Sequence, residues 1–133
     1  MTILFTHPGS SPWGQIDHCD ILCPGIFQVS TSSHGGIMVA REVEGTLSSA
    51  ARMCGERYGG YLCYEEDADE AIVLRELLDK GLWAIPERVK DKARFEEIIN
   101  NTIRDWNPEY WRSYQLLLQE TQRARLVQVQ NER

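Results

Sequence analysis

The fold is decided by residues 12–36, which read PWGQIDHCDILCPGIFQVSTSSHGG. The Pro-Gly dipeptide at residues 24–25 is a turn signal, and apolar residues alternate with polar ones on both sides of it. This pattern predicts a β-hairpin, and a further short strand is expected after the glycine pair. The three predicted strands cover residues 15–23, 26–31 and 36–41.

The remainder of the chain shows helical periodicity. A capping box formed by Asp67 and Glu70 indicates a helix start, and Asn107-Pro108 places a favoured N-cap residue before a favoured first helical residue. A short apolar run at 61–64 is expected to be extended. The predicted helices cover 45–58, 65–80, a segment from Pro86 with an apolar stripe that ends at Trp106, and a segment from Pro108 that becomes ambiguous beyond Arg123.

Strands therefore precede helices along the chain, and this order is typical of an α+β fold. We expect a small antiparallel sheet in the N-terminal half packed against about four helices in the C-terminal half. The length of 133 residues predicts a single domain spanning 1–133, with a β-rich part at 1–41 and a helical part at 45–126.

The composition is that of a soluble protein, with 42% hydrophobic residues and a net charge of −6. No apolar run reaches the ~18 residues of a membrane helix, and the N-terminus shows no basic, apolar leader, so we expect a cytosolic protein. Residues 64–103 hold eleven acids against six bases. This acidity argues against direct nucleic-acid binding and favours a partner with a basic surface.

The four cysteines are expected to be reduced thiols rather than a disulfide framework or a zinc site. They do not form the close pairs that structural zinc sites use, and no cofactor or metal is expected. Alternation along a strand predicts that Cys19 and Cys23 share one face. The other two cysteines are Cys54 and Cys63.

His34 is the first candidate for chemistry, because it lies among hydroxyl side chains and before paired glycines. It would serve as a general base or a metal ligand at neutral pH, with Ser30 to Ser33 offering nucleophiles. The alternative is a loop between two strands, with the histidine satisfied by backbone groups. No nucleophile-elbow or phosphate-loop pattern is present.

A run of acids is the second candidate. Clustered carboxylates suit a divalent cation or a partner's arginines, whereas acids at a helix start also gain from the helix dipole. EF-hand spacing is absent. The run comprises Glu65, Glu66, Asp67, Asp69 and Glu70.

Aromatic residues form the third candidate, either as a recognition surface or, by their helical spacing, as core. Trp13 is expected either to tuck under the hairpin or to contact a partner, and Trp83 is left open between core and surface. The remaining members are Trp106, Tyr110, Trp111 and Tyr114.

Taken together, several motifs resemble a small domain of unknown function carried by plasmids, integrative elements and phages, often near anti-restriction genes. They are Pro12-Trp13-Gly14, Pro24-Gly25-Ile26, Val29-Ser30-Thr31-Ser32-Ser33-His34-Gly35-Gly36 and Tyr64-Glu65-Glu66-Asp67, within residues 11–75. The resemblance implies no activity. It does suggest that His34 and the Glu65–Asp67 group lie near one another, where a carboxylate would orient the histidine.

The sequence therefore favours an anti-CRISPR or anti-restriction protein that binds a host defence protein in the host cytosol. The five acids would make the electrostatic contacts, and Trp13 and Trp83 would anchor them. The alternative is a small hydrolase-like or nucleotide-modifying enzyme that uses His34 with Glu65, Glu66 or Asp67, Glu66 being the preferred partner. A third possibility is an accessory domain that binds proteins without inhibiting them, and the oligomeric state is left open.

Overall fold

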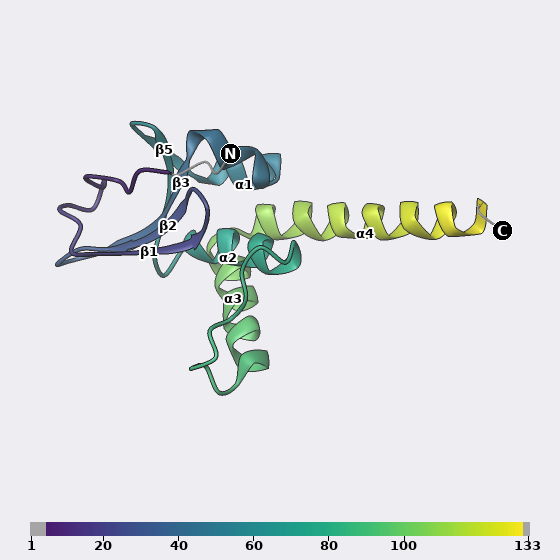
Figure 1. Cartoon of the computed structure of the whole chain (residues 1–133). Helices are drawn as coiled ribbons and strands as arrows, with labels where there is room; N and C mark the ends of the chain where they lie inside the picture. The colour runs from purple at the N-terminus through teal and green to yellow at the C-terminus, as the bar shows by residue number, and fades with distance from the viewer. Residues whose placement is uncertain (1–4, 132–133) are drawn as a thin grey trace.

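A computed structural model describes residues 5–131 and shows a five-stranded antiparallel sheet with helices on one side (Figure 1). The strands lie in the order β1-β2-β3-β5-β4. The predicted α+β class is confirmed. The strands are β1 (His18–Cys23), β2 (Ile26–Ser30), β3 (Gly35–Ala40), β4 (Glu56–Tyr58) and β5 (Tyr61–Glu65).

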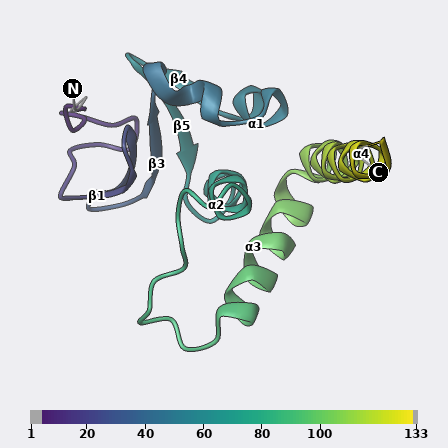
Figure 2. The same cartoon turned by 45° about the vertical axis from the view of Figure 1, so that its right-hand side comes forward.

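The helices form layers on the sheet. Helix α2 packs beside the sheet, α3 packs on α2, and α4 projects from the body as one long helix (Figures 1 and 2). Among residues 5–131, no helix combines the length and apolar character needed to cross a bilayer. The helices are the 3-10 helix η1 (Arg41–Thr46), α1 (Ser49–Cys54), α2 (Glu70–Asp79), α3 (Lys92–Trp106) and α4 (Pro108–Asn131).

The two faces of the sheet bury different clusters, because successive side chains point to opposite sides. The face toward the helices contributes Ile26, Ile37, Val39, Leu62 and Tyr64 to the main core. The other face is covered by the N-terminal segment and contains Phe27, Val29, Met38 and Cys63.

Trp13 lies on this second face, directly over Gly36 in β3. A Cβ atom at Gly36 would lie 2.5 Å from Cη2 of Trp13, so the indole occupies the space that only a glycine leaves open. Trp13 thus packs against the sheet and remains half-buried, and contact with a partner stays a prediction.

Helix α2 is fixed to its neighbours by polar contacts from two adjacent residues, Arg75 and Glu76. Glu76 has no solvent exposure and accepts hydrogen bonds from Ser48 N (2.7 Å), Ser48 Oγ (2.6 Å) and Tyr110 Oη (2.6 Å). Arg75 donates to Glu96 of α3 at 2.8 Å and to Asn100 of α3 at 3.1 Å. One buried carboxylate thus joins the start of α1 to α2 and α4.

The helix predicted over 45–58 is wrong at both ends. Ser48 is the N-cap of α1, with its side chain accepting from Ala51 N at 3.1 Å, and the helix ends at Cys54. Residues 56–58 instead form β4, which pairs with β5. The part expected to be helical, 45–126, therefore contains two strands that complete the sheet.

The predicted capping box is also wrong. Asp67 has a φ of 65°, which is a left-handed conformation, and α2 begins three residues later. The residue at the N-cap, Asp69, makes no cap hydrogen bond, because its carboxylate accepts from Asn107 Nδ2 at 2.9 Å.

The observed bounds of α3 and α4 agree more closely with those predicted from the sequence. Helix α3 begins at Lys92 rather than at Pro86, with Asp91 as the N-cap residue that accepts from Arg94 N at 2.9 Å. The boundary at Asn107-Pro108 is confirmed, and α4 continues to Asn131 through the segment that the sequence left ambiguous.

A β-bulge changes the face of the last residues of β1. The pairing with β2 shifts register between Ile21 and Cys23. Cys19 consequently packs under the N-terminal segment, whereas Leu22 and Cys23 pack against the helix-side core. The expectation that Cys19 and Cys23 share one face is wrong for this reason.

Candidate functional site

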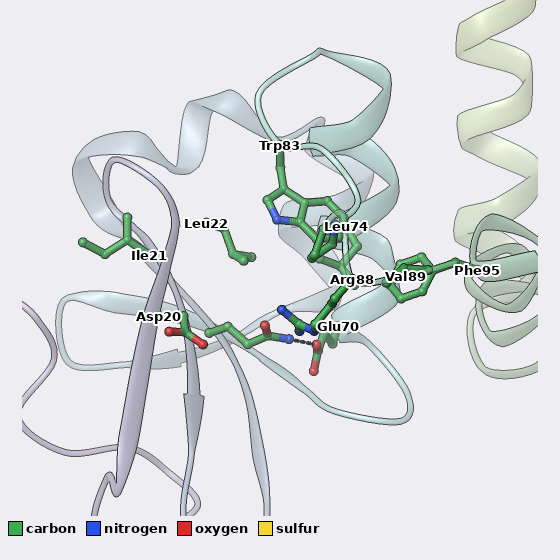
Figure 3. Close-up of a pocket in the computed structure, with 11 residues that line it drawn as sticks. Asp20, Ile21, Leu22, Glu70, Leu74, Trp83, Arg88, Val89 and Phe95 are labelled. Atoms are coloured by element: carbon green, nitrogen blue, oxygen red, sulfur yellow. Dashed lines mark hydrogen bonds between the residues drawn. The ribbon is translucent and has the colours of Figure 1, made fainter. Parts of the chain in front are cut away.

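An open pocket of about 500 Å³ lies between the β1–β2 hairpin, α2 and the segment that connects α2 to α3. In Figure 3, Asp20, Ile21 and Leu22 lie on one side of Glu70, Val89 and Phe95 lie on the other, and the Arg88 side chain extends toward Glu70. This volume falls within the ~300–1,000 Å³ that is usual for ligand pockets. The lining residues are Asp20, Ile21, Leu22, Gln28, Glu70, Leu74, Trp83, Pro86, Arg88, Val89 and Phe95.

Glu70 is the most perturbed acid of this site. As the first residue of α2 it faces the sheet, where its Oε1 accepts a hydrogen bond from Nε2 of Gln28. Burial raises the pKa of Glu70 to about 7, and the nearby charges of Glu66 and Asp67 add to the rise, while the Gln28 hydrogen bond opposes it. At neutral pH this carboxyl group therefore exchanges between charged and neutral forms.

A second hollow of about 210 Å³ adjoins the pocket and shares Asp20, Gln28 and Glu70 with it. It adds His18 and Glu66 to the lining. The imidazole of His18 pairs with Asp20 at 3.1 Å at an exposed position of β1. The hairpin and the start of α2 therefore share an edge that is rich in carboxylates.

The turn between β5 and α2 carries Glu65, Glu66 and Asp67. Glu65 and Asp67 are exposed, and none of the three carboxylates has a hydrogen bond or an ion pair within residues 5–131. Other acids of the chain are neutralised, as Glu44 is by Arg57 at 3.0 Å. We name Glu65, Glu66 and Asp67 the acidic turn.

The other two predicted contact acids have partners inside the molecule. Asp69 accepts from Asn107 and so joins α2 to the start of α4, and Glu70 accepts from Gln28. The structure thus divides this run of acids into two carboxylates that make tertiary contacts and three without a partner in the described part of the chain.

His34 lies in the tight turn between β2 and β3. Thr31 N donates to His34 O at 2.8 Å, and His34 N donates to Thr31 Oγ1 at 3.1 Å. The ring is exposed and, within the described part of the chain, has no hydrogen bond or ion pair with a carboxylate. The backbones do meet, because Glu66 N donates to Gly35 O at 2.9 Å. The two motifs are neighbours along the sheet, but no histidine–carboxylate pair is formed.

The aromatic candidates divide between core and surface. Tyr110 and Tyr114 are buried and stacked, with ring centroids 5.6 Å apart. Trp83 is half-buried beside Phe95, and Trp106 is 65% exposed, which corrects its expected place on the buried stripe of α3. Trp111 lies half-buried under the guanidinium of Arg104, 5.2 Å from the ring centroid.

The cysteines are free thiols. Burial raises the pKa of Cys63 to about 11, so it stays protonated and unreactive at neutral pH. Within residues 5–131, no three His, Cys, Asp or Glu side chains converge as a metal site requires.

Sequence reasoning missed Gln28 and Arg88 as residues of this site. The signal for Gln28 was its position in the strand. It lies two residues after Ile26 and therefore on the same face, which packs against the helices. A polar side chain at such a position needs a hydrogen-bond partner, which Glu70 provides. Arg88 gives no comparable signal.

These features define a small α+β protein with an acidic, hollowed edge. Residues 6–132 match the family described as Domain of unknown function (DUF7007), and the chain belongs to that family. The match extends through α3 and α4, well beyond the motifs at 11–75. No curated protein and no solved structure matches the chain.

Proposed function

We propose that this chain is an anti-defence protein of a phage or other mobile element that inhibits a host CRISPR or restriction protein by binding it. The observation that carries the proposal is the acidic turn, where three consecutive carboxylates have no cationic partner among residues 5–131. The resemblance of the motifs to a domain often encoded near anti-restriction genes supports the defence setting.

The electrostatics of the turn favour a basic partner. Glu66 and Asp67 act on Glu70 strongly enough to contribute to its raised pKa, so negative charge is crowded at this edge. A basic surface would relieve this repulsion on binding and would speed association through charge complementarity.

The nucleic-acid channel of a defence protein has the required charge, because such proteins contact phosphate backbones with lysine and arginine. An acidic turn seated in that channel competes with the nucleic acid. With a net charge of −6, the chain itself is poorly suited to bind nucleic acid, and no membrane contact is involved. The inhibitor acts in the host cytosol, where its target works.

The test is protection of phage or plasmid DNA in cells that carry an active CRISPR or restriction system. The informative variant combines Glu65→Gln, Glu66→Gln and Asp67→Asn. Asparagine is chosen at position 67 because it tolerates the left-handed φ of 65°. Ion pairs at a protein surface are each worth at most ~1 kcal/mol, so we expect the triple variant to lose about 1–3 kcal/mol of binding free energy.

A matched control combines Glu42→Gln, Glu56→Gln and Glu120→Gln, which are exposed acids elsewhere on the molecule. Both triple variants change the net charge by the same three units. Protection that survives in the control and is lost in the acidic-turn variant supports the proposal. Equal protection by both variants contradicts it.

A further inference from the structure

We propose that the pocket beside Glu70 receives an arginine side chain of the basic partner. This inference rests on the proposed function and adds to it a specific recognition site. Glu65 and Asp67 of the acidic turn are exposed, whereas the pocket is a concave site lined by both apolar and polar side chains.

The base of the pocket offers a paired acceptor. Gln28 Nε2 donates to Glu70 Oε1, which leaves Oε1 of Gln28 and the remaining carboxylate oxygen of Glu70 as acceptors. A guanidinium presents several N–H donors in one plane and can bond two neighbouring acceptors at once. The ammonium of lysine lacks this planar fork.

The walls suit the rest of an arginine side chain. Leu22, Leu74 and Val89 line the pocket and can pack against the methylene stem. Trp83, held beside Phe95 with ring centroids 6.3 Å apart, offers an indole to the guanidinium plane. The pocket thus matches both the apolar and the charged part of one side chain.

The charges that line the pocket favour a cation. Asp20 comes from β1 and Glu70 from α2, with Glu66 and His18 in the adjoining hollow. Of the described residues that line the pocket, Arg88 is the one with a cationic side chain. It is exposed and has no ion pair within residues 5–131, so it can turn into solvent when a ligand enters.

The experiment is a titration of the ¹⁵N-labelled full chain, at a pH above 7, with N-acetyl-arginine methylamide. The reporters are the indole N–H of Trp83 and the side-chain amide of Gln28. The corresponding citrulline derivative is the matched control, since it keeps the shape of arginine and lacks the charge. We expect saturable shifts with arginine and none with citrulline, and equal shifts with both compounds overturn the proposal.

Three variants sharpen the test. Glu70→Gln keeps the acceptor for Gln28 and removes the charge, and it should weaken arginine binding roughly tenfold, the effect expected for one charge-assisted hydrogen bond. Glu120→Gln removes a charge on the projecting part of α4 and should leave binding unchanged. Arg88→Gln, at an exposed position that does not risk the fold, should tighten binding. Unaltered affinity in both Glu70→Gln and Arg88→Gln overturns the proposal.

The two proposals fail separately. If arginine leaves the Trp83 and Gln28 signals unmoved, the pocket proposal is overturned even where the chain protects DNA. If the acidic-turn variant protects as well as its control, the proposed function is overturned. The arginine titration uses only the purified chain and does not depend on that result.

Discussion

The hydroxyl of Tyr110 in α4 donates a 2.6 Å hydrogen bond to Oε2 of Glu76, a carboxylate of α2 with no solvent exposure. Ser48, at the start of α1, donates to the same carboxylate through its backbone and its hydroxyl. Burial and the neighbouring Glu76 raise the pKa of Tyr110, so the phenol remains a donor throughout the physiological range. The packing of α1, α2 and α4 therefore depends on the carboxylate of Glu76.

Replacing this acid should be among the most damaging single changes in the chain. Glu76→Ala leaves the donors of Ser48 and Tyr110 buried without an acceptor, and we expect a loss of about 3–5 kcal/mol in the free energy of unfolding. Tyr110→Phe removes one donor and should cost about 1–2 kcal/mol. Urea unfolding monitored by circular dichroism measures both, and a midpoint for Glu76→Ala equal to that of the unaltered chain contradicts the assignment.

Glu70 should make stability depend on pH in the opposite sense to a salt-bridged acid. Its pKa is raised from the ordinary 4.5 to about 7 on folding, so the folded state binds more protons between these values. Stability from this group is therefore greatest at low pH and falls as pH rises through 7, by at most ~3 kcal/mol. Glu70→Gln should remove this dependence, which a comparison of unfolding at pH 5 and pH 8 would show. A variant that keeps the full pH dependence would falsify the account.

His34→Ala tests the enzyme alternative. The ring is exposed and has no partner in the described part of the chain, so we expect a change in unfolding free energy within about 0.5 kcal/mol. DNA protection should also be retained, since the proposed contacts lie on the acidic turn. Loss of protection by a variant that folds normally would instead favour chemistry at His34.

Gly36→Ala should disturb the packing of Trp13 against the sheet. The new methyl group would press on the Trp13 indole and on the carbonyl oxygen of Tyr64, and overpacking of this kind costs about 1–3 kcal/mol. Gly45→Ala is the control, because nothing lies within 4 Å of its Cβ position. Thermal unfolding and tryptophan emission give the comparison, and equal melting temperatures for the two variants speak against this packing.

Turn and capping residues correctly located those strands and helices whose ends are determined by residues close in the sequence. The Pro-Gly turn located the hairpin, and Asn107-Pro108 located the start of α4. The start of α2 was misplaced because the backbone reverses at Asp67 and Asp69 turns its carboxylate to Asn107, which lies 38 residues away along the chain. The residues near Asp69 in the sequence do not reveal a contact over that distance along the chain.

The same limit applies to the site. The sequence identified Glu70 as one acid in a run, but its raised pKa arises from burial and from its position against Gln28, which is 42 residues away. The residues that complete the pocket come from β1, α2 and the segment before α3. Only the fold brings them together.

The buried anchors of α4 are Tyr110 and Tyr114, both in its first two turns, although the helix runs to Asn131. At a rise of ~1.5 Å per residue, the part beyond Tyr114 reaches roughly 25 Å from the body. A helical segment of this length is only marginally stable in water by itself. Amide hydrogens of the second turn, where N–H groups donate within the helix from Trp111 onward, should therefore exchange slowly, while those beyond Tyr114 should exchange quickly. In mechanical terms the molecule is a rigid body joined to a helical extension beyond Tyr114, and the stiffness of that extension depends on what surrounds it.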